Sequence, residues 1–194
     1  MAENKVKYGL KNVYYAVATI DASTHAATYS TPVAFPGAVS LSLDPEGELT
    51  PFRADNVDYW VGNSNNGYSG DLEMALITDS FRKDVLGYTD DDNGVLVENK
   101  DVEAVHFALM FQFEGDQKAT KHVLYNCTST RPSAAGETTA ETIEPQTETV
   151  TITASSIYNA SLEREIVKAS TGDSTDSTVY DGWTSAVYSP EVAS

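Results

Sequence analysis

Alternation of apolar and polar residues is the clearest pattern in this sequence. Residues 39–44 place Val, Leu and Leu between Ser, Ser and Asp, and residues 71–76 repeat the spacing with Leu, Met and Leu. In residues 149–153, Val and Ile alternate with threonines. Because successive side chains of a strand point to opposite faces, each segment predicts a strand with one buried face. Residues 9–20 carry consecutive apolar positions, which favours a strand covered on both faces.

The clearest hairpin pattern lies between residues 105 and 127. Large apolar residues occupy every second position of its first half, and a polar turn around Gly115 leads into a second strand-like segment, residues 122–127. The intervening positions, which include His106, are expected on a more polar face. We predict that the apolar series forms the centre of the core: Val105, Phe107, Leu109, Phe111 and Phe113.

One short helix is predicted over residues 78–86. Thr78 or Asp79 is suited to cap its first amides, and Gly87 stands where a left-handed residue commonly ends a helix. Phe81 and Val85, which are four positions apart, lie on the same face of this helix. So short a helix depends on packing that face against a sheet rather than on intrinsic propensity.

Turns and loops are predicted where Gly, Pro, Asn, Asp and Ser gather. Residues 44–47 (Asp-Pro-Glu-Gly) form a predicted turn, after which residues 49–54 are expected to return as the partner strand. Residues 21–32 are a predicted loop, and residues 55–70 are predicted to be an extended loop. Residues 129–148, rich in Ser, Thr, Ala, Glu and Pro, read as a long acidic arm.

The extended loop at residues 55–70 has the composition of a contact surface. It carries Tyr59, Trp60 and Tyr68 among several asparagines, including Asn63, and glycines. Aromatic side chains on a polar loop often mark an interface, although they also fold back onto their own domain. We therefore take Tyr59, Trp60, Asn63 and Tyr68 as candidates for contact between subunits.

Composition fits one mainly β domain. The 194 residues are 41% hydrophobic and include 11 Tyr, and aromatic and branched residues favour strands. Cys127 is the only cysteine, so no internal disulfide is expected, as in a protein that folds in a reducing cytoplasm. We expect no membrane association, because the polar N-terminus lacks a signal-peptide core and no apolar stretch approaches the length of a membrane span.

Charge argues against a nucleic-acid-binding protein. The formal net charge is −17, and a surface of this sign repels phosphate. Such an excess is explained equally by solubility and by a surface past which DNA must slide without adhering.

The sequence offers no catalytic or metal-binding constellation that we recognise. His122 and Cys127 are five positions apart on one predicted strand, and strict alternation sends them to opposite faces. Residues 90–94 fail as a calcium loop, because Thr89 and Lys100 fall where that loop needs carboxylates. Phosphate-binding glycine loops and the nucleophile elbow are also missing. We expect no enzyme, cofactor or metal.

Many short segments, in order along nearly the whole chain, resemble the phi13-type major tail proteins of long-tailed, siphovirus-like bacteriophages. No single segment is decisive, but so many in order form a specific pattern. They are residues 8–16 (Tyr-Gly-Leu-Lys-Asn-Val-Tyr-Tyr-Ala), 35–43 (Phe-Pro-Gly-Ala-Val-Ser-Leu-Ser-Leu), 52–56, 67–76, 81 with 85–88, 107–116, 122–127 and 131–132.

The resemblance implies a mainly β tail-tube fold spanning residues 1–194 as a single domain. Such a fold has two packed antiparallel sheets, sandwich-like or barrel-like, with a short flanking helix and long loops or arms. It also implies a structural virion protein, assembled in the host bacterial cytoplasm, whose hexameric rings stack into the tail tube that conducts DNA during ejection. The implied partners are further copies of the chain and the tape measure, distal tail and tail terminator proteins. Double-stranded DNA would pass without specific binding.

A tube of this kind needs a lining that DNA does not bind. Six copies at −17 each carry roughly −100 charges, enough for a strong repulsive field if part of it faces the bore. The lining candidates are Asp44, Glu46, Glu48, Glu137, Glu141 and Glu144.

Two alternatives stay open at this stage. One is a virion-displayed carbohydrate-binding β-sandwich in which Tyr59, Trp60 and Tyr68 form a stacking platform. The other is the tube protein of a phage-like contractile injection or secretion system.

Overall fold

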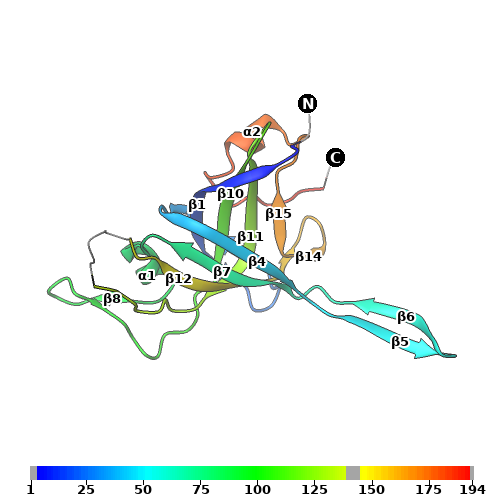
Figure 1. Cartoon of the computed structure of the whole chain (residues 1–194), viewed down its shortest axis with the longest axis horizontal. Coiled ribbons are helices and arrows are strands. Elements are labelled where there is room, and N and C mark those ends of the chain that lie inside the picture. Colours follow the sequence, from blue (N-terminus) through cyan, green and yellow to red (C-terminus); the bar gives the residue numbers. More distant parts are fainter. Residues whose placement is uncertain (1–3, 139–144, 193–194) are drawn as a thin grey trace.

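The computed structural model describes residues 4–138 and 145–192 and shows a mainly β protein built on antiparallel strands (Figure 1). Its main sheet follows the order β2-β1-β10-β11-β12-β7-β4, while β3 pairs with β1 and β15 with β11. The expected mainly β class is confirmed. The strands of this sheet are β1 (Lys7–Ile20), β2 (Ala27–Tyr29), β3 (Val33–Ala34), β4 (Ala38–Glu46), β7 (Gly67–Met74), β10 (Phe107–Gly115), β11 (Thr120–Ser129), β12 (Glu148–Ser155) and β15 (Lys168–Ser170).

The sheet divides at β11. One edge of this strand pairs with β10, whereas its other edge pairs with β15 at residues 122–124 and with β12 at residues 126–129. The register with β10 shifts between the pairs Phe107–Cys127 and Leu109–Leu124, which places one extra residue in β11. Such a bulge bends and twists a strand, and here it lies where the two branches separate.

Both faces of the β10–β11 hairpin are buried. Phe107, Leu109 and Phe111 belong to the larger core cluster, which also takes residues from β1, β4, β7, β12 and the first helix. The opposite face, expected to be polar, instead places Ala108 and Met110 in a second cluster with Trp183. The predicted apolar face is thus correct. Burial of the second face was not predicted, because its apolar residues, Ala108 and Met110, share that face with polar ones.

The predicted helix is α1 (Asp79–Asp84), which is shorter than the predicted 78–86 range. The Thr78 hydroxyl caps it by accepting a hydrogen bond from the Phe81 amide at 3.3 Å. Gly87 follows with φ +71°, where an added Cβ would lie 2.2 Å from a Val102 methyl. Phe81 is fully buried and stacks on Phe35 with ring centroids 4.5 Å apart. A second short helix, α2 (Ser177–Asp181), precedes the buried Trp183.

Two sequence predictions near the middle of the chain are wrong. Residues 44–47 do not turn, because β4 continues to Glu46 in register with Gly67 of β7. Residues 55–70 are mostly strand rather than loop: β5 (Leu49–Ala54) pairs with β6 (Val57–Asn63), not with β4. The β5–β6 hairpin, which we call the arm, extends the β4–β7 ribbon away from the body (Figure 1).

The remaining segments are short hairpins and irregular chain. Residues 130–138 and 145–147 form no helix or strand, in line with the acidic arm expected at 129–148, of which residues 139–144 lie outside the described part. The predicted loop at 21–32 contains β2. In the described residues no helix is long and apolar enough to cross a membrane. The small hairpins are β8 (Thr89–Asp90) with β9 (Leu96–Val97), and β13 (Ile157–Asn159) with β14 (Arg164–Ile166).

Candidate subunit interface

The arm is a hairpin with a tight turn and one register shift, between the pairs Phe52–Trp60 and Arg53–Asp58, which leaves Tyr59 as an extra residue in β6. Asp55 and Asn56 have φ values of +52° and +63° and connect Ala54 to Val57. A two-residue turn whose twist matches that of the flanking strands requires two successive residues in the left-handed conformation. Asp and Asn tolerate this conformation well. The turn chemistry therefore explains why this stretch, which looks like a loop by composition, folds back on itself as two strands.

The apolar side chains of the arm are uncovered. Tyr59 is 72% exposed and Trp60 is 62% exposed, and neither core cluster contains a residue from the arm. A two-stranded hairpin is only marginally stable in water by itself, and a contiguous exposed apolar surface usually marks an interaction site. The large exposed side chains of the arm are Leu49, Phe52, Val57, Tyr59, Trp60 and Val61.

Local packing on the arm presents the indole of Trp60 outward. Trp60 is the cross-strand partner of Phe52. Its ring lies over Gly62, where an added Cβ would come within 2.6 Å of the indole. Arg53 and Asp58 form an ion pair of 2.7 Å nearer the tip. Gly62 thus leaves space for the Trp60 ring, and Trp60 and Phe52 are both exposed at paired positions of the two strands.

The four contact candidates do not all lie together. Tyr59 and Trp60 are on β6 of the arm, and Asn63 ends β6, although its side chain lies outside the described part of the structure. Tyr68 is half-buried on β7, where the Lys168 ammonium lies 4.4 Å from its ring centroid. Tyr68 therefore belongs to the body and not to the arm. The three aromatic residues Tyr59, Trp60 and Tyr68 do not form the stacking platform that was considered from the sequence.

Some of the acidic candidates flank the root of the arm. Asp44 and Glu46 are exposed on the last residues of β4, and Glu48 is exposed between β4 and β5. Glu137 is exposed in the irregular segment, whereas Glu141 and Glu144 lie outside the described residues. Asp44, Glu46 and Glu48 follow one another along one ribbon. Among the described residues, no hydrogen bond or ion pair links Glu137 to these three side chains.

A groove opens between β4 and the β10–β11 hairpin. It has a volume of about 190 Å³ and an apolar, aromatic floor with a lysine on each rim. The Lys7 ammonium lies 4.8 Å from the Phe113 ring centroid, and Lys168 covers Tyr68 as described above. We call this feature the rim groove; its lining is Lys7, Leu41, Leu43, Tyr68, Phe111, Phe113, His122, Leu124 and Lys168.

His122 is the imidazole in the lining of the rim groove. It stacks on Phe111 with centroids 5.1 Å apart, and its Nδ1 atom is buried without a hydrogen-bond partner in the described structure. Burial, together with the positive charges of Lys168 and Lys7, lowers the pKa of His122 to about 4. The ring is therefore neutral near pH 7 and presents a buried nitrogen that lacks a partner.

The prediction that His122 and Cys127 face opposite ways is wrong. Both lie toward the larger core, because the bulge in β11 resets the alternation between Leu124 and Cys127. They still form no pair: His122 stacks on Phe111, while Cys127 is fully buried and its thiol contacts the Leu124 carbonyl at 3.9 Å. Burial raises the pKa of Cys127 to about 12, which keeps the thiol protonated and unreactive.

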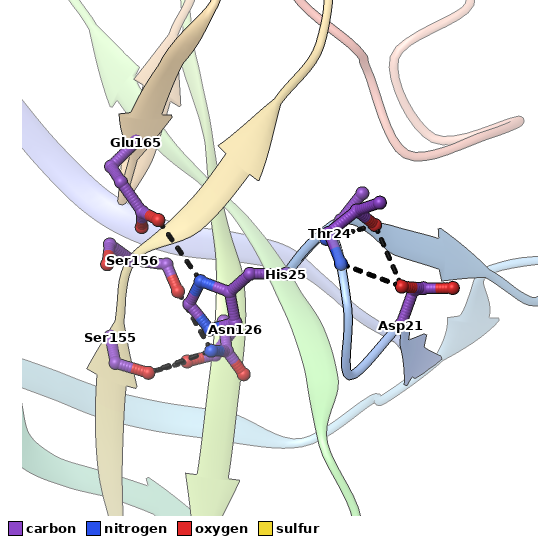
Figure 2. A network of polar contacts seen from close by, with 8 residues as sticks. Asp21, Thr24, His25, Asn126, Ser155, Ser156 and Glu165 are labelled. Carbon is purple, nitrogen blue, oxygen red and sulfur yellow. Dashed lines mark hydrogen bonds and ion pairs between the residues drawn. The ribbon is translucent and has the colours of Figure 1, made fainter.

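A second polar cluster joins the β11–β12 branch to the loop after β1 (Figure 2). The buried Asn126 side chain donates to Ser155 Oγ at 2.8 Å and to the Ser156 carbonyl at 3.0 Å, while its Oδ1 lies 2.7 Å from His106 Nδ1. His25 meets Glu165 at 3.1 Å on the surface. These hydrogen bonds and this ion pair connect backbone segments that are distant in the sequence. The described residues contain no group of three or more side chains that could bind a metal ion.

Comparison with known proteins gives a distant structural likeness. No family model matches the chain, and no curated protein matches it. Among solved structures, the chain is similar to one in the cryo-EM structure of the anti-feeding prophage baseplate, with a TM-score of 0.47 and 11% sequence identity, covering 90% of this chain and 100% of that chain. Function is therefore inferred from the surfaces of this chain itself.

Proposed function

We infer that this chain is a structural subunit of a phage-like tail, specifically a major tail protein whose hexameric rings stack into the tail tube. The observation that carries the proposal is the arm, a hairpin whose large apolar side chains have no cover within the described chain. An element that is marginal alone and apolar on its surface gains stability from a neighbouring molecule. The ordered sequence resemblance to major tail proteins supports the same class.

The edges of the main sheet suit assembly as well. β4 ends the strand order on one side, and only short strands flank β1 on the other. Unpaired edges are a hazard for a monomer but a means of joining identical subunits. Pro45, which has no amide hydrogen, lies within β4, and proline is tolerated on an edge strand.

The partners follow from the proposed role. Further copies of the chain form the rings, and tape measure, distal tail and tail terminator proteins set the length and the ends of the tube. The excess of negative charge would let double-stranded DNA pass without adhering to the wall. In this proposal the chain is a virion component without catalytic activity.

The proposal is tested by assembly of purified protein with an altered arm. We expect the natural protein to form rings or tubes at high concentration in negative-stain images, and Phe52→Ser with Trp60→Ser to raise the concentration needed by at least about tenfold, because two large apolar contacts are lost. A matched control changes Val95→Ser and Val97→Ser on the β8–β9 hairpin, both well exposed and distant in sequence from the arm.

Two results would count against the proposal. One is natural protein that stays monomeric at every concentration and does not enter phage tails. The other is equal loss of assembly in the arm variant and in the β8–β9 control.

A further inference from the structure

We propose that the rim groove of one copy receives Trp60 from the arm of a second copy. This inference rests on the proposed function, because it identifies the surface on which the arm of a tail subunit docks. The donor and receiving surfaces are both present in one chain: the arm continues beyond Glu46 and Gly67, and the groove lies along the β4–β7 ribbon at Leu41, Leu43 and Tyr68.

The rim groove has the size and lining for an aromatic ring. Its volume of about 190 Å³ exceeds the roughly 150 Å³ of an apolar cavity known to admit benzene, so an indole is a reasonable occupant. Phe111 and Phe113 already meet edge-on with centroids 5.5 Å apart, which leaves ring faces and edges for a further aromatic contact. Leu41 and Leu43 of β4 supply the facing apolar wall.

Polar groups in the rim groove complement an indole. A neutral histidine carries its proton on one nitrogen, and the buried Nδ1 of His122 has no partner within the described chain. Nδ1 has almost no accessible surface, so an indole in the groove would meet the His122 ring through its face or edge rather than through Nδ1. Lys7 and Lys168 on the rims already lie against aromatic rings and would also attract the face of an inserted indole.

The direction of the arm requires that the groove belong to another molecule. The arm continues outward from β4 and β7 and points away from the body that contains the rim groove (Figure 1). Because the arm and the groove are different surfaces, the contact is heterologous: each copy donates an arm and receives one. Contacts of this type close into rings or propagate as filaments.

Disulfide trapping between variants that each gain one exposed cysteine tests this contact. One population carries Tyr59→Cys, next to an intact Trp60, and the other carries Lys168→Cys or Lys7→Cys on a rim of the groove. All three positions are exposed in the described structure, and the natural Cys127 is fully buried and contributes no background. The matched control pairs Tyr59→Cys with Val97→Cys, an exposed position on β9.

We expect mild oxidation to join Tyr59→Cys to either rim cysteine at least about tenfold faster than to the control, with the gain abolished by adding Trp60→Ser to the arm partner. Thermal unfolding of each variant verifies that it is folded. If rings or tubes form but the rim cysteines react no faster than the control, docking in the groove is wrong and the proposed function stands. If the protein neither assembles nor crosslinks, both are wrong.

Discussion

The protonation of the His122 side chain depends on residues from several strands. Lys7 of β1, Lys168 of β15 and the rings of Phe111 and Phe113 all surround it. Two cations and partial burial disfavour a charged imidazole, so the folded protein holds the neutral form at a pH where an unfolded chain would already be protonated.

This difference makes a prediction about pH. Because the pKa of His122 is about 4 when folded and about 6.5 when unfolded, the unfolded state binds more protons between these values. The stability contributed by the neutral ring is therefore complete above about pH 6.5 and falls as the pH is lowered toward 4. We expect His122→Leu to reduce this loss, measured as the urea midpoint of unfolding at a series of pH values between about 4.5 and 7.

His106→Leu is a control for this measurement only in part, because His106 contacts Asn126. His25→Leu has the same weakness, because His25 pairs with Glu165 at 3.1 Å and has a φ of +57°, so both variants are measured beside the natural protein. A natural protein and a His122→Leu variant with the same pH dependence would contradict the prediction.

Particular residues also show where sequence reasoning succeeded. The alternation from Phe107 to Phe111 identified the core face, because a period of two survives in β10. The same rule misplaced Cys127 relative to His122, because one extra residue in β11 is invisible to a pattern that assumes ideal pairing. The unpartnered Nδ1 of His122 depends on tertiary packing alone, and no sequence feature indicates it.

At the level of elements, the arm is the main feature that sequence analysis misread. Its asparagines and glycines have the composition of a loop, and Asp44-Pro45-Glu46-Gly47 has the composition of a turn. In the structure the actual turn lies at Asp55 and Asn56, and the earlier segment stays extended because β7 pairs with it. Pairing between distant segments thus overrides local turn preference. Tyr59 and Trp60 stay candidates for contact between subunits, and the structure shows that both side chains are exposed.

The arm should be dispensable for folding of the body. No member of either core cluster comes from residues 49–63, so we expect their replacement by a short Gly-Ser turn to change the unfolding temperature of the monomer by no more than a few degrees. Circular dichroism during heating measures this. The replacement is expected to abolish assembly in sedimentation experiments.

A matched variant makes the comparison informative. Phe81→Ala removes a fully buried ring that packs against Tyr15, Phe35 and Phe107, and should cost about 3–5 kcal/mol. Loss of the arm that destabilises the monomer as much as Phe81→Ala would show that the arm belongs to the folding unit.

At the scale of the whole molecule, charge opposes the proposed assembly. Each chain carries −17, and identical surfaces brought together repel one another. Salt shortens the range of this repulsion to about 10 Å at 0.1 M and about 3 Å at 1 M. The apolar arm and an open sheet edge must therefore supply enough attraction to exceed the repulsion between neighbouring copies.

We expect the concentration required for assembly to fall as sodium chloride is raised from about 0.05 to about 0.5 M, measured by light scattering or sedimentation. Replacing Asp44→Asn, Glu46→Gln and Glu48→Gln together should lower that concentration at low salt and weaken its salt dependence, if these side chains face one another around a bore. Assembly that weakens with added salt would instead indicate that attraction between opposite charges holds the copies together.

The arm is joined to the body only through β4 and β7, and this has a mechanical consequence. β7 is held by β12 along the register from Tyr68–Ala154 to Met74–Glu148, and by β4 on its other edge. Hydrogen bonds in such ladders run across the strands, so a pull transmitted along the arm loads them side by side in shear rather than opening them one after another. In the proposed tube, stretching or bending would accordingly distribute tension over the whole ladder of each subunit.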